Sequence, residues 1–204
     1  MRALKPLAIA FSLLTLAACS QHKNATITDE DMSIGKADAP VTVVEYASVA
    51  CPGCAKFNNE NWAQVKKAYI DTGKARWVVK EMFTHNPSWA AMGFMTARCL
   101  GKDKYFDAID AMYKAQPDID ASQDVKGGMS KIAKQFGMDG KSFEACVGDE
   151  AALAKMNDRV EKSSREDKIG STPTFVINGQ VLNTEATAAS VGAAIDAAAK
   201  AKAG

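Results

Sequence analysis

The stretch VTVVEYASVACPGC, residues 41–54, decides the fold, because it joins a strand to a pair of cysteines. Its β-branched first half is typical of a strand buried on both faces. Residues 55–70 show helical spacing, and Asp71-Thr72-Gly73 ends that pattern. ARWVVKEM, residues 75–82, then predicts a second strand. The sequence therefore predicts a β-α-β unit with two cysteines at the start of its helix. The apolar face of that helix is expected to comprise Phe57, Trp62, Val65, Ala68 and Tyr69.

A long helical block follows this unit, from Ser88 to about Lys168. Its breaks are predicted at Gly101, Pro117, Gly127-Gly128, Gly137 and Gly140. Asp139 and Ser142 are candidate helix caps.

Strand character returns only near the end of the chain, at Thr174–Ile177. Asn178-Gly179 is a strong two-residue hairpin signal, and it predicts a return strand over residues 180–182. An Ala-rich helix closes the chain. We therefore expect one α/β fold that a helical block interrupts.

The CPGC motif, Cys51 to Cys54, is the main candidate for chemistry. Two cysteines three residues apart at a helix N-terminus can form a disulfide. The unpaired backbone N–H groups and the helix dipole there stabilise a thiolate on the first cysteine of the pair. Cys51 is therefore the expected nucleophile and Cys54 the resolving cysteine. Half of a zinc site looks the same, but the chain has no second CxxC and no closely spaced His pair. A purely structural disulfide is the other alternative, and it leaves the position between strand and helix unexplained.

Pro173, directly before the predicted strand at residue 174, is the second candidate. Strands accept Pro at their first residue, at edges or at bulges, so an edge strand explains it without function. A cis X–Pro bond occurs in only about 5–6% of cases.

Together, PVTVVEYASVACPGC (40–54), the helical block and GSTPTFVING (170–179) resemble the DsbA family of exported thioredoxin-fold oxidoreductases. The resemblance implies a thioredoxin fold with residues 38–86 as its first part, 87–169 as a helical insertion and 170–204 as its second part.

The resemblance also implies roles for individual residues. Pro173 would be cis and lie against the CxxC, and Thr172 would offer its backbone N–H and C=O to a substrate chain. Glu45 would be the buried acid below the disulfide, moving the proton of Cys54 through water. If residues 41–47 formed an edge strand, Glu45 would instead lie in water.

Two positions depart from the family pattern. Its oxidases commonly carry His between the cysteines, where this chain has Pro52-Gly53. The residue before the proline is Val in the best-known oxidases and Thr in the isomerase relatives, as Thr172 is here. The direction of electron flow therefore stays open at this point.

The N-terminus predicts export. Arg2 and Lys5 precede a short apolar run, too short for the roughly 20 residues that span a bilayer, so residues 1–18 are interpreted as a signal peptide. LAAC, ending at Cys19, resembles the lipobox of bacterial lipoproteins, which predicts a lipid on Cys19; ordinary cleavage to a soluble exported protein is the alternative. Residues 19–37 are expected to be a polar tether.

The cysteine count agrees with this interpretation. An exported chain with five cysteines has one left over after pairing, and a lipid on Cys19 accounts for it. Cys51 pairs with Cys54, which leaves Cys99 and Cys146 as an expected structural disulfide; two buried free thiols are the alternative.

The composition of the chain argues against nucleic acid as a partner. With 25 Lys and Arg against 24 Asp and Glu, the chain has no basic footprint for nucleic acid. We assign His85 no role. The methionines of the helical block, Met92, Met95, Met112, Met129 and Met138, are expected to pack in the core rather than bind copper.

The predicted function is a disulfide donor that works through a mixed disulfide, with the Cys51–Cys54 bond in place of any cofactor or metal. Its partners would be reduced or misfolded exported proteins and a membrane protein that recycles the cysteines. The protein is expected to be a monomer, lipid-anchored on the periplasmic face of the cell envelope. The alternatives are an isomerase or reductase of the same fold and a copper-binding module.

Overall fold

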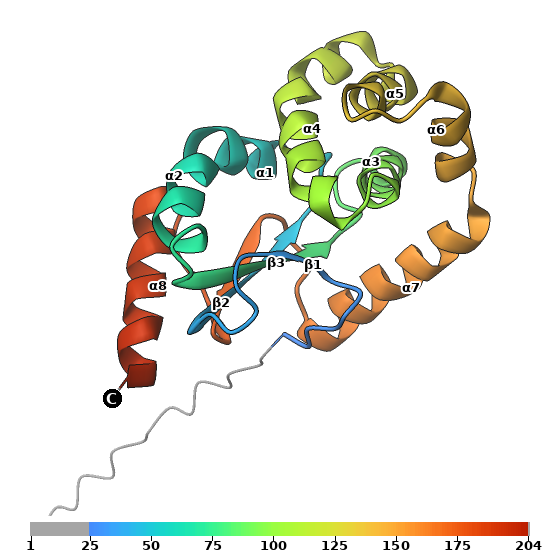
Figure 1. Ribbon diagram of the computed structural model, residues 1–204. Helices are drawn as coiled ribbons and strands as arrows, with labels where there is room; N and C mark the ends of the chain where they lie inside the picture. Colours follow the sequence, from blue (N-terminus) through green and yellow to red (C-terminus); the bar gives the residue numbers. More distant parts are fainter. Residues whose placement is uncertain (1–24, 204) are drawn as a thin grey trace, which may run out of the picture.

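The computed structural model describes residues 25–203 (Figure 1). The predicted signal peptide, the proposed lipidation site Cys19 and the start of the tether lie outside the described residues. Among the helices that the structure describes, none combines the length and the apolarity needed to cross a bilayer.

A single five-stranded sheet lies at the centre of the described chain, in the order β1-β3-β2-β4-β5. Its strands are β1 (Met32–Ile34), β2 (Val41–Ala47), β3 (Ala75–Glu81), β4 (Thr174–Ile177) and β5 (Gln180–Val181). β2 and β3 are parallel, as the two strands of a β-α-β unit must be, and the other neighbours are antiparallel. The predicted thioredoxin fold with its helical block is confirmed.

The hairpin between β4 and β5 forms as its sequence predicts. Asn178 and Gly179 have φ values of 44° and 84°, the positive pair that a two-residue hairpin turn requires. The Asn178 side chain also accepts a hydrogen bond of 2.8 Å from the Thr42 N–H, which ties the turn to β2. β5 is one residue shorter than predicted.

The prediction that residues 19–37 form a tether is wrong over β1. This strand pairs antiparallel with β3, with Met32 opposite Val79. The strand is only three residues long, so its apolar-polar-apolar pattern is too short to predict a strand. Asp31, just before the strand, also forms an ion pair of 2.9 Å with Lys80 of β3, which the sequence pattern does not show.

The helix after the CPGC motif contains two π-helical segments. It runs through α1 (Pro52–Phe57), the π-helical η1 (Asn58–Trp62), α2 (Ala63–Val65) and the π-helical η2 (Lys66–Ile70). A π-helical turn takes in an extra residue and rotates the helix face. This explains why Ala68, predicted on the apolar face, is exposed while Ile70 is buried.

The helical block contains α3 (Pro87–Cys99), α4 (Lys102–Ser122), α5 (Val125–Gln135), α6 (Gly140–Val147) and α7 (Glu150–Asp167). Asp139 caps α6 as predicted, accepting from the Ser142 N–H at 2.8 Å. Ser142 is not itself a cap. It lies in the first turn, and its hydroxyl bonds to the carboxylate of Asp139.

Two predicted breaks in this block are wrong. Pro117 lies inside α4, where it cannot bond to the carbonyl of Tyr113; the Asn59 side-chain amide donates to that carbonyl instead, at 3.4 Å. Gly127-Gly128 lies inside α5. A Cβ on Gly128 would come within 2.6 Å of the Ile119 side chain, so this glycine serves the close approach of α4 and α5 rather than a turn.

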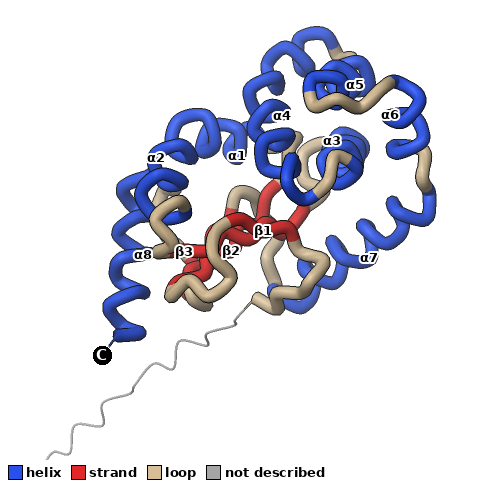
Figure 2. The backbone as a smooth tube through the Cα atoms, in the orientation of Figure 1, coloured by secondary structure: helices blue, strands red, loops and turns tan. Residues whose placement is uncertain are grey.

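Helices cover both faces of the sheet, as the red strands between blue helices in Figure 2 show. On one face Val43, Trp77 and Phe175 pack with α1 and with the final helix α8 (Ala188–Ala203). On the other face Val44 and Tyr46 form a smaller cluster, covered in part by residues 25–27.

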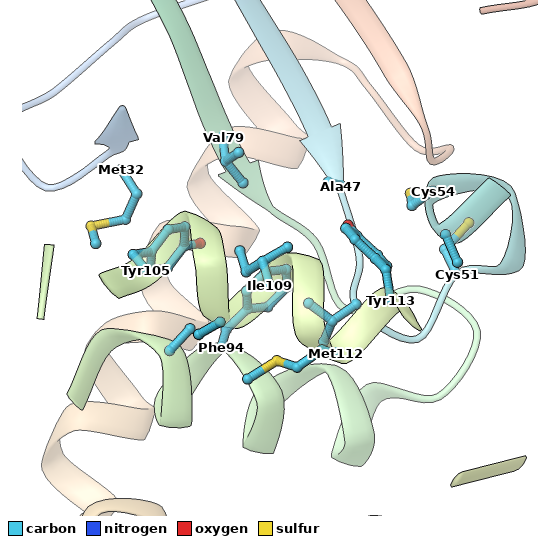
Figure 3. Packing of buried hydrophobic residues seen from close by; sticks show 14 of the residues in the cluster. Met32, Ala47, Cys51, Cys54, Val79, Phe94, Tyr105, Ile109, Met112 and Tyr113 are labelled. Carbon is cyan, nitrogen blue, oxygen red and sulfur yellow. The ribbon is translucent and has the colours of Figure 1, made fainter. Parts of the chain in front are cut away.

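The methionines of the helical block pack as predicted. Met95, Met112 and Met129 are buried in the main core, and Met92 and Met138 pack against it. Figure 3 shows Met112 in this cluster, between α3 and the thiol site.

Candidate active site

Cys51 is the residue at which the loop after β2 becomes a helix. It is the N-cap of α1, and Pro52 occupies the first helical position, where the missing N–H of proline costs nothing. Cys51 and Cys54 are 1% and 0% exposed, and they are the two free cysteines among the described residues. Figure 3 shows both side chains at the start of this helix, beside Tyr113 of α4.

The surroundings of Cys51 favour its thiolate. They lower the pKa of its thiol from 9.0 to about 5, chiefly through a hydrogen bond from the Cys54 side chain. Burial opposes this, whereas the Thr172 side chain and the backbone N–H groups of Cys54 and Gly53 add further hydrogen bonds. The two backbone donors are free amides at the N-terminus of α1, as the sequence predicts.

Cys54 behaves in the opposite way. Burial raises the pKa of its thiol well above 9.0, and the hydrogen bond to Cys51 and the charge of Glu45 raise it further. The two thiols are therefore unequal: at neutral pH Cys51 is a thiolate and Cys54 keeps its proton.

Thr172 and Pro173 lie directly against this pair. The Thr172–Pro173 peptide bond is cis, and the Cys51 thiol donates to the Thr172 carbonyl at 3.3 Å. A Cβ on Gly53 would lie 3.0 Å from Pro173 Cδ, tighter than most real contacts. The Pro52-Gly53 dipeptide thus lets the proline approach the thiols, a role the sequence does not reveal.

Glu45 is buried in the middle of the sheet, because β2 lies between β3 and β4. The alternative of an edge strand with Glu45 in water is wrong. Its carboxylate accepts a hydrogen bond of 3.0 Å from Trp77 Nε1, and burial raises its pKa from 4.5 to about 7.

A small cavity of about 20 Å³ borders Glu45. Its polar lining also includes Asn58 and Tyr113. That volume holds about one water molecule, and three polar groups are enough to bind one. Glu45 can therefore exchange a proton with water while remaining buried.

A groove of about 240 Å³ is lined by Pro173, by the helix that follows Cys51 and by residues 185–187. The ion pair of Lys56 and Glu185, 3.3 Å apart and exposed, crosses it. A larger hollow of about 660 Å³ lies between α4 and α5, and none of its lining residues belongs to the thiol site.

Cys99 and Cys146 lie away from the thiol pair and form a disulfide that joins α3 to α6, with their Cα atoms 6.2 Å apart. His85 is exposed in the loop after β3, with a positive φ of 64°. Over residues 25–203, no three or more His, Cys, Asp or Glu side chains gather as they would around a metal ion.

Sequence reasoning missed several side chains of this site, above all Ser48, Trp77, Thr84 and Tyr113. Trp77, Thr84 and Tyr113 reach the site by folding rather than by proximity to a motif. Ser48 alone had a local signal, as a small polar residue between a buried strand and the CPGC motif.

Comparisons with known proteins agree with this geometry. A family model described as thioredoxin matches residues 27–197. A Rickettsia bellii protein named as a protein-disulfide oxidoreductase is 28% identical over 84% of this chain and 66% of its own length. Disulfide bond formation protein D of Bacillus subtilis is 27% identical over 73% of this chain and 68% of its own.

Among solved structures, α-DsbA1 of Wolbachia pipientis matches with a TM-score of 0.79 and 20% identity, over 87% of this chain and 94% of that one. The chain spans only 66% of the R. bellii relative and 55% of one from Rickettsia conorii. The family model covers well over half of the described residues, and the fold is shared with DsbA-like structures, so the chain belongs to the thioredoxin family.

Proposed function

We propose that this protein is a thiol–disulfide oxidoreductase that donates the Cys51–Cys54 disulfide to reduced exported proteins. The observation that carries the proposal is the inequality of the two thiols, with a pKa of about 5 at Cys51 and one well above 9.0 at Cys54. The relatives named for disulfide exchange and disulfide bond formation support it.

The reaction begins with the oxidised pair. A substrate thiolate attacks the Cys51 sulfur, which forms a mixed disulfide and releases Cys54 as a thiolate. Cys54 then takes a proton. A second substrate thiolate attacks the substrate sulfur of the mixed disulfide, which forms the substrate's disulfide and releases Cys51. Two substrate thiols are oxidised and the two enzyme cysteines are reduced.

The direction of electron flow, from substrate to enzyme, follows from the low pKa of the leaving group Cys51. A thiol of low pKa leaves readily and is stable once released, so the last step favours a reduced enzyme and an oxidised substrate. Glu45 supplies the proton for Cys54 through water, since its pKa of about 7 keeps a large protonated fraction near neutral pH. Thr172 and Pro173 would hold the substrate chain beside Cys51, next to the groove along α1.

The test is the oxidation of a reduced protein that needs several disulfides, with and without a chelator. The oxidised enzyme is expected to speed the reaction equally in both, and Cys51→Ser to abolish it. Loss of activity with the chelator would favour the metal-binding alternative, and no catalysis by the wild type would contradict the proposal.

An isomerase or reductase of the same fold is the second candidate, favoured by Thr before the cis-proline. A substrate with scrambled disulfides separates the two functions. A donor accelerates the oxidation of the reduced substrate and not the rescue of the scrambled one, whereas an isomerase does the reverse.

Location is a proposal from the sequence: residues 1–18 direct export, and a lipid on Cys19 anchors a monomer to the membrane, where a membrane redox protein reoxidises it. Cys19→Ser should release the protein into the soluble exported fraction without loss of redox activity. Continued membrane association of that variant would contradict the anchor.

A further inference from the structure

A hydrogen bond joins two threonine side chains beside the thiol site. The hydroxyl oxygens of Thr84 and Thr172 are 2.6 Å apart, across a sequence separation of 88 residues. Thr84 lies in the loop after β3, and both side chains are half-buried. Among the described residues, Thr172 is the one hydrogen-bond partner of the Thr84 hydroxyl. Nothing in the proposed chemistry uses Thr84 directly.

The loop of Thr84 is anchored to the segment that carries the nucleophile. The hydroxyl of Ser48, which is fully buried, donates to the Thr84 carbonyl at 3.2 Å. The Ser48 carbonyl in turn accepts from the Cys51 N–H at 3.0 Å. Thr84 and Cys51 are therefore held at a set distance through one buried residue.

Thr172 has two hydrogen-bonding groups that Cys51 can use, and the charge on sulfur selects between them. As a thiol, Cys51 donates to the Thr172 carbonyl at 3.3 Å. As a thiolate it can only accept, so the donor it needs is the Thr172 hydroxyl, whose hydrogen bond helps to lower the pKa of Cys51. The Thr172 oxygen is then free to accept, and the Thr84 hydroxyl, which can act as donor or acceptor, lies 2.6 Å from it.

We propose that Thr84 is a positioning residue for the exchange reaction: its hydroxyl donates to that of Thr172 and so directs the Thr172 proton at the Cys51 thiolate. The inference rests on the proposed function. Hydrogen bonds in such a chain polarise one another, so the outer one strengthens the inner one by about 10–30%. Thr84 thereby favours the reduced form without touching sulfur or substrate.

The test compares Thr84→Val with Thr84→Ser in the reduced protein. Thr84→Val keeps the shape and removes the donor, so the pKa of Cys51, followed by thiolate absorbance, should rise by about 0.5. The equilibrium constant with glutathione should fall about threefold, or about 15 mV at about 30 mV per tenfold. Thr84→Ser should keep both values at those of the wild type.

A double-mutant cycle separates positioning from a general effect on structure. In a Thr172→Val background, Thr84→Val should change neither quantity, because no hydroxyl remains to be directed. Thr72→Val, at an exposed threonine beyond η2, is the matched control and should change neither. Cys54 and Glu45, the titratable groups that act on Cys51, are present in every variant.

An unchanged or lowered pKa in Thr84→Val would overturn the inference, since a lowered value would mean that Thr84 draws the Thr172 proton away from sulfur. Failure of Thr84→Ser to match the wild type would do the same, by showing a packing role. Thr84→Ala repeats the test if Thr84→Val does not fold. If the wild type itself catalyses no exchange, the proposed function fails, whereas an active wild type with an unresponsive Thr84 refutes only this inference.

Discussion

At the scale of single residues, hydrogen bonds give two neighbouring thiols opposite properties. Cys51 accepts hydrogen bonds from Cys54, Thr172 and the start of α1, whereas burial, the hydrogen bond to Cys51 and the charge of Glu45 all raise the pKa of Cys54. A thiolate that accepts several hydrogen bonds is stable even where little water reaches it. The reactivity of the pair is therefore a property of these contacts.

The contact that lowers the pKa of Cys51 most is the hydrogen bond from Cys54, and it can be tested by substituting Cys54. Cys54→Ala removes the S–H donor, and the pKa of Cys51 should rise by about 1–2, since a hydrogen bond to a charged group is worth about 1.5–3 kcal/mol. Cys54→Ser keeps an O–H donor and should stay nearer to 5. The pH dependence of iodoacetamide alkylation measures both. Equal values in the two variants would show that the Cys54 contact is not the cause.

The raised pKa of Glu45 makes the stability of the protein depend on pH, because this pKa rises from 4.5 to about 7 on folding. The folded state then holds the proton more tightly than the unfolded state between these values. Stability is full below about pH 4.5 and falls by up to about 1.4 kcal/mol per pH unit toward pH 7. Glu45→Gln should remove this slope in the oxidised protein, measured by urea unfolding between pH 4.5 and 8.

The oxidised form is chosen for this measurement because its active-site thiols do not titrate. The control is Glu144→Gln, whose side chain is 58% exposed, and it should keep the slope of the wild type. A slope that survives in Glu45→Gln would mean that other groups titrate on folding in this range.

At the scale of elements, the sheet and the helical block are joined by charges as well as by apolar contacts. Lys80 of β3 is 5% exposed and pairs with Asp31 at 2.9 Å, which holds the segment before β1 on the domain. Glu81, the next residue, accepts hydrogen bonds from Arg98 of α3 and Tyr105 of α4. The last two residues of β3 thus connect the N-terminal segment to the helical block.

Asp31→Asn tests the first of these links. It leaves a buried ammonium group without its counter-charge, and breaking such a pair costs about 3–5 kcal/mol of unfolding free energy. The carbonyl of Thr26, which accepts from Lys80, moderates the loss. Urea unfolding measures it, with Asp29→Asn at an exposed position as the control. A loss no larger than that of the control would show that the pair does not hold the segment.

The disulfide between α3 and α6 gives a second prediction at this scale. Cys99 and Cys146 are 47 residues apart, and a loop of this length is worth about 4 kcal/mol in the chain-entropy model. Replacing both by Ala should lower the unfolding free energy by that amount. Mass spectrometry of the oxidised wild type checks the pairing directly, and two free thiols at these positions would contradict it.

These two scales explain what could be predicted from the sequence. The β-α-β unit, the hairpin and the CPGC position depend on local period and turn chemistry, so the sequence was enough for them. The pairing of Thr84 with Thr172 and the burial of Lys80 against Asp31 depend on contacts between distant segments. Pro117 is wrongly predicted to break the helix because the Tyr113 carbonyl that it leaves without a donor accepts from the side-chain amide of Asn59, which belongs to a different helix.

At the scale of the whole molecule, the fold brings three separate segments to one point. β2 and α1 supply the thiols, the segment before β4 supplies Thr172 and Pro173, and the loop after β3 supplies Thr84. The lowered pKa of Cys51 stabilises the reduced form, and a disulfide is a stronger oxidant the more its reduced form is stabilised. The proposed role as a disulfide donor depends on this stabilisation of the reduced form.

Equilibration of the Cys51–Cys54 pair with glutathione, read by separating the oxidised and reduced proteins, tests this claim most directly. Thioredoxin and DsbA, both relatives, mark the range at about −270 and −120 mV. With a stabilised thiolate but no His between the cysteines, the reduction potential should fall between these two values. A potential at or below about −270 mV would mean that electrons run the other way and that the protein is a reductase.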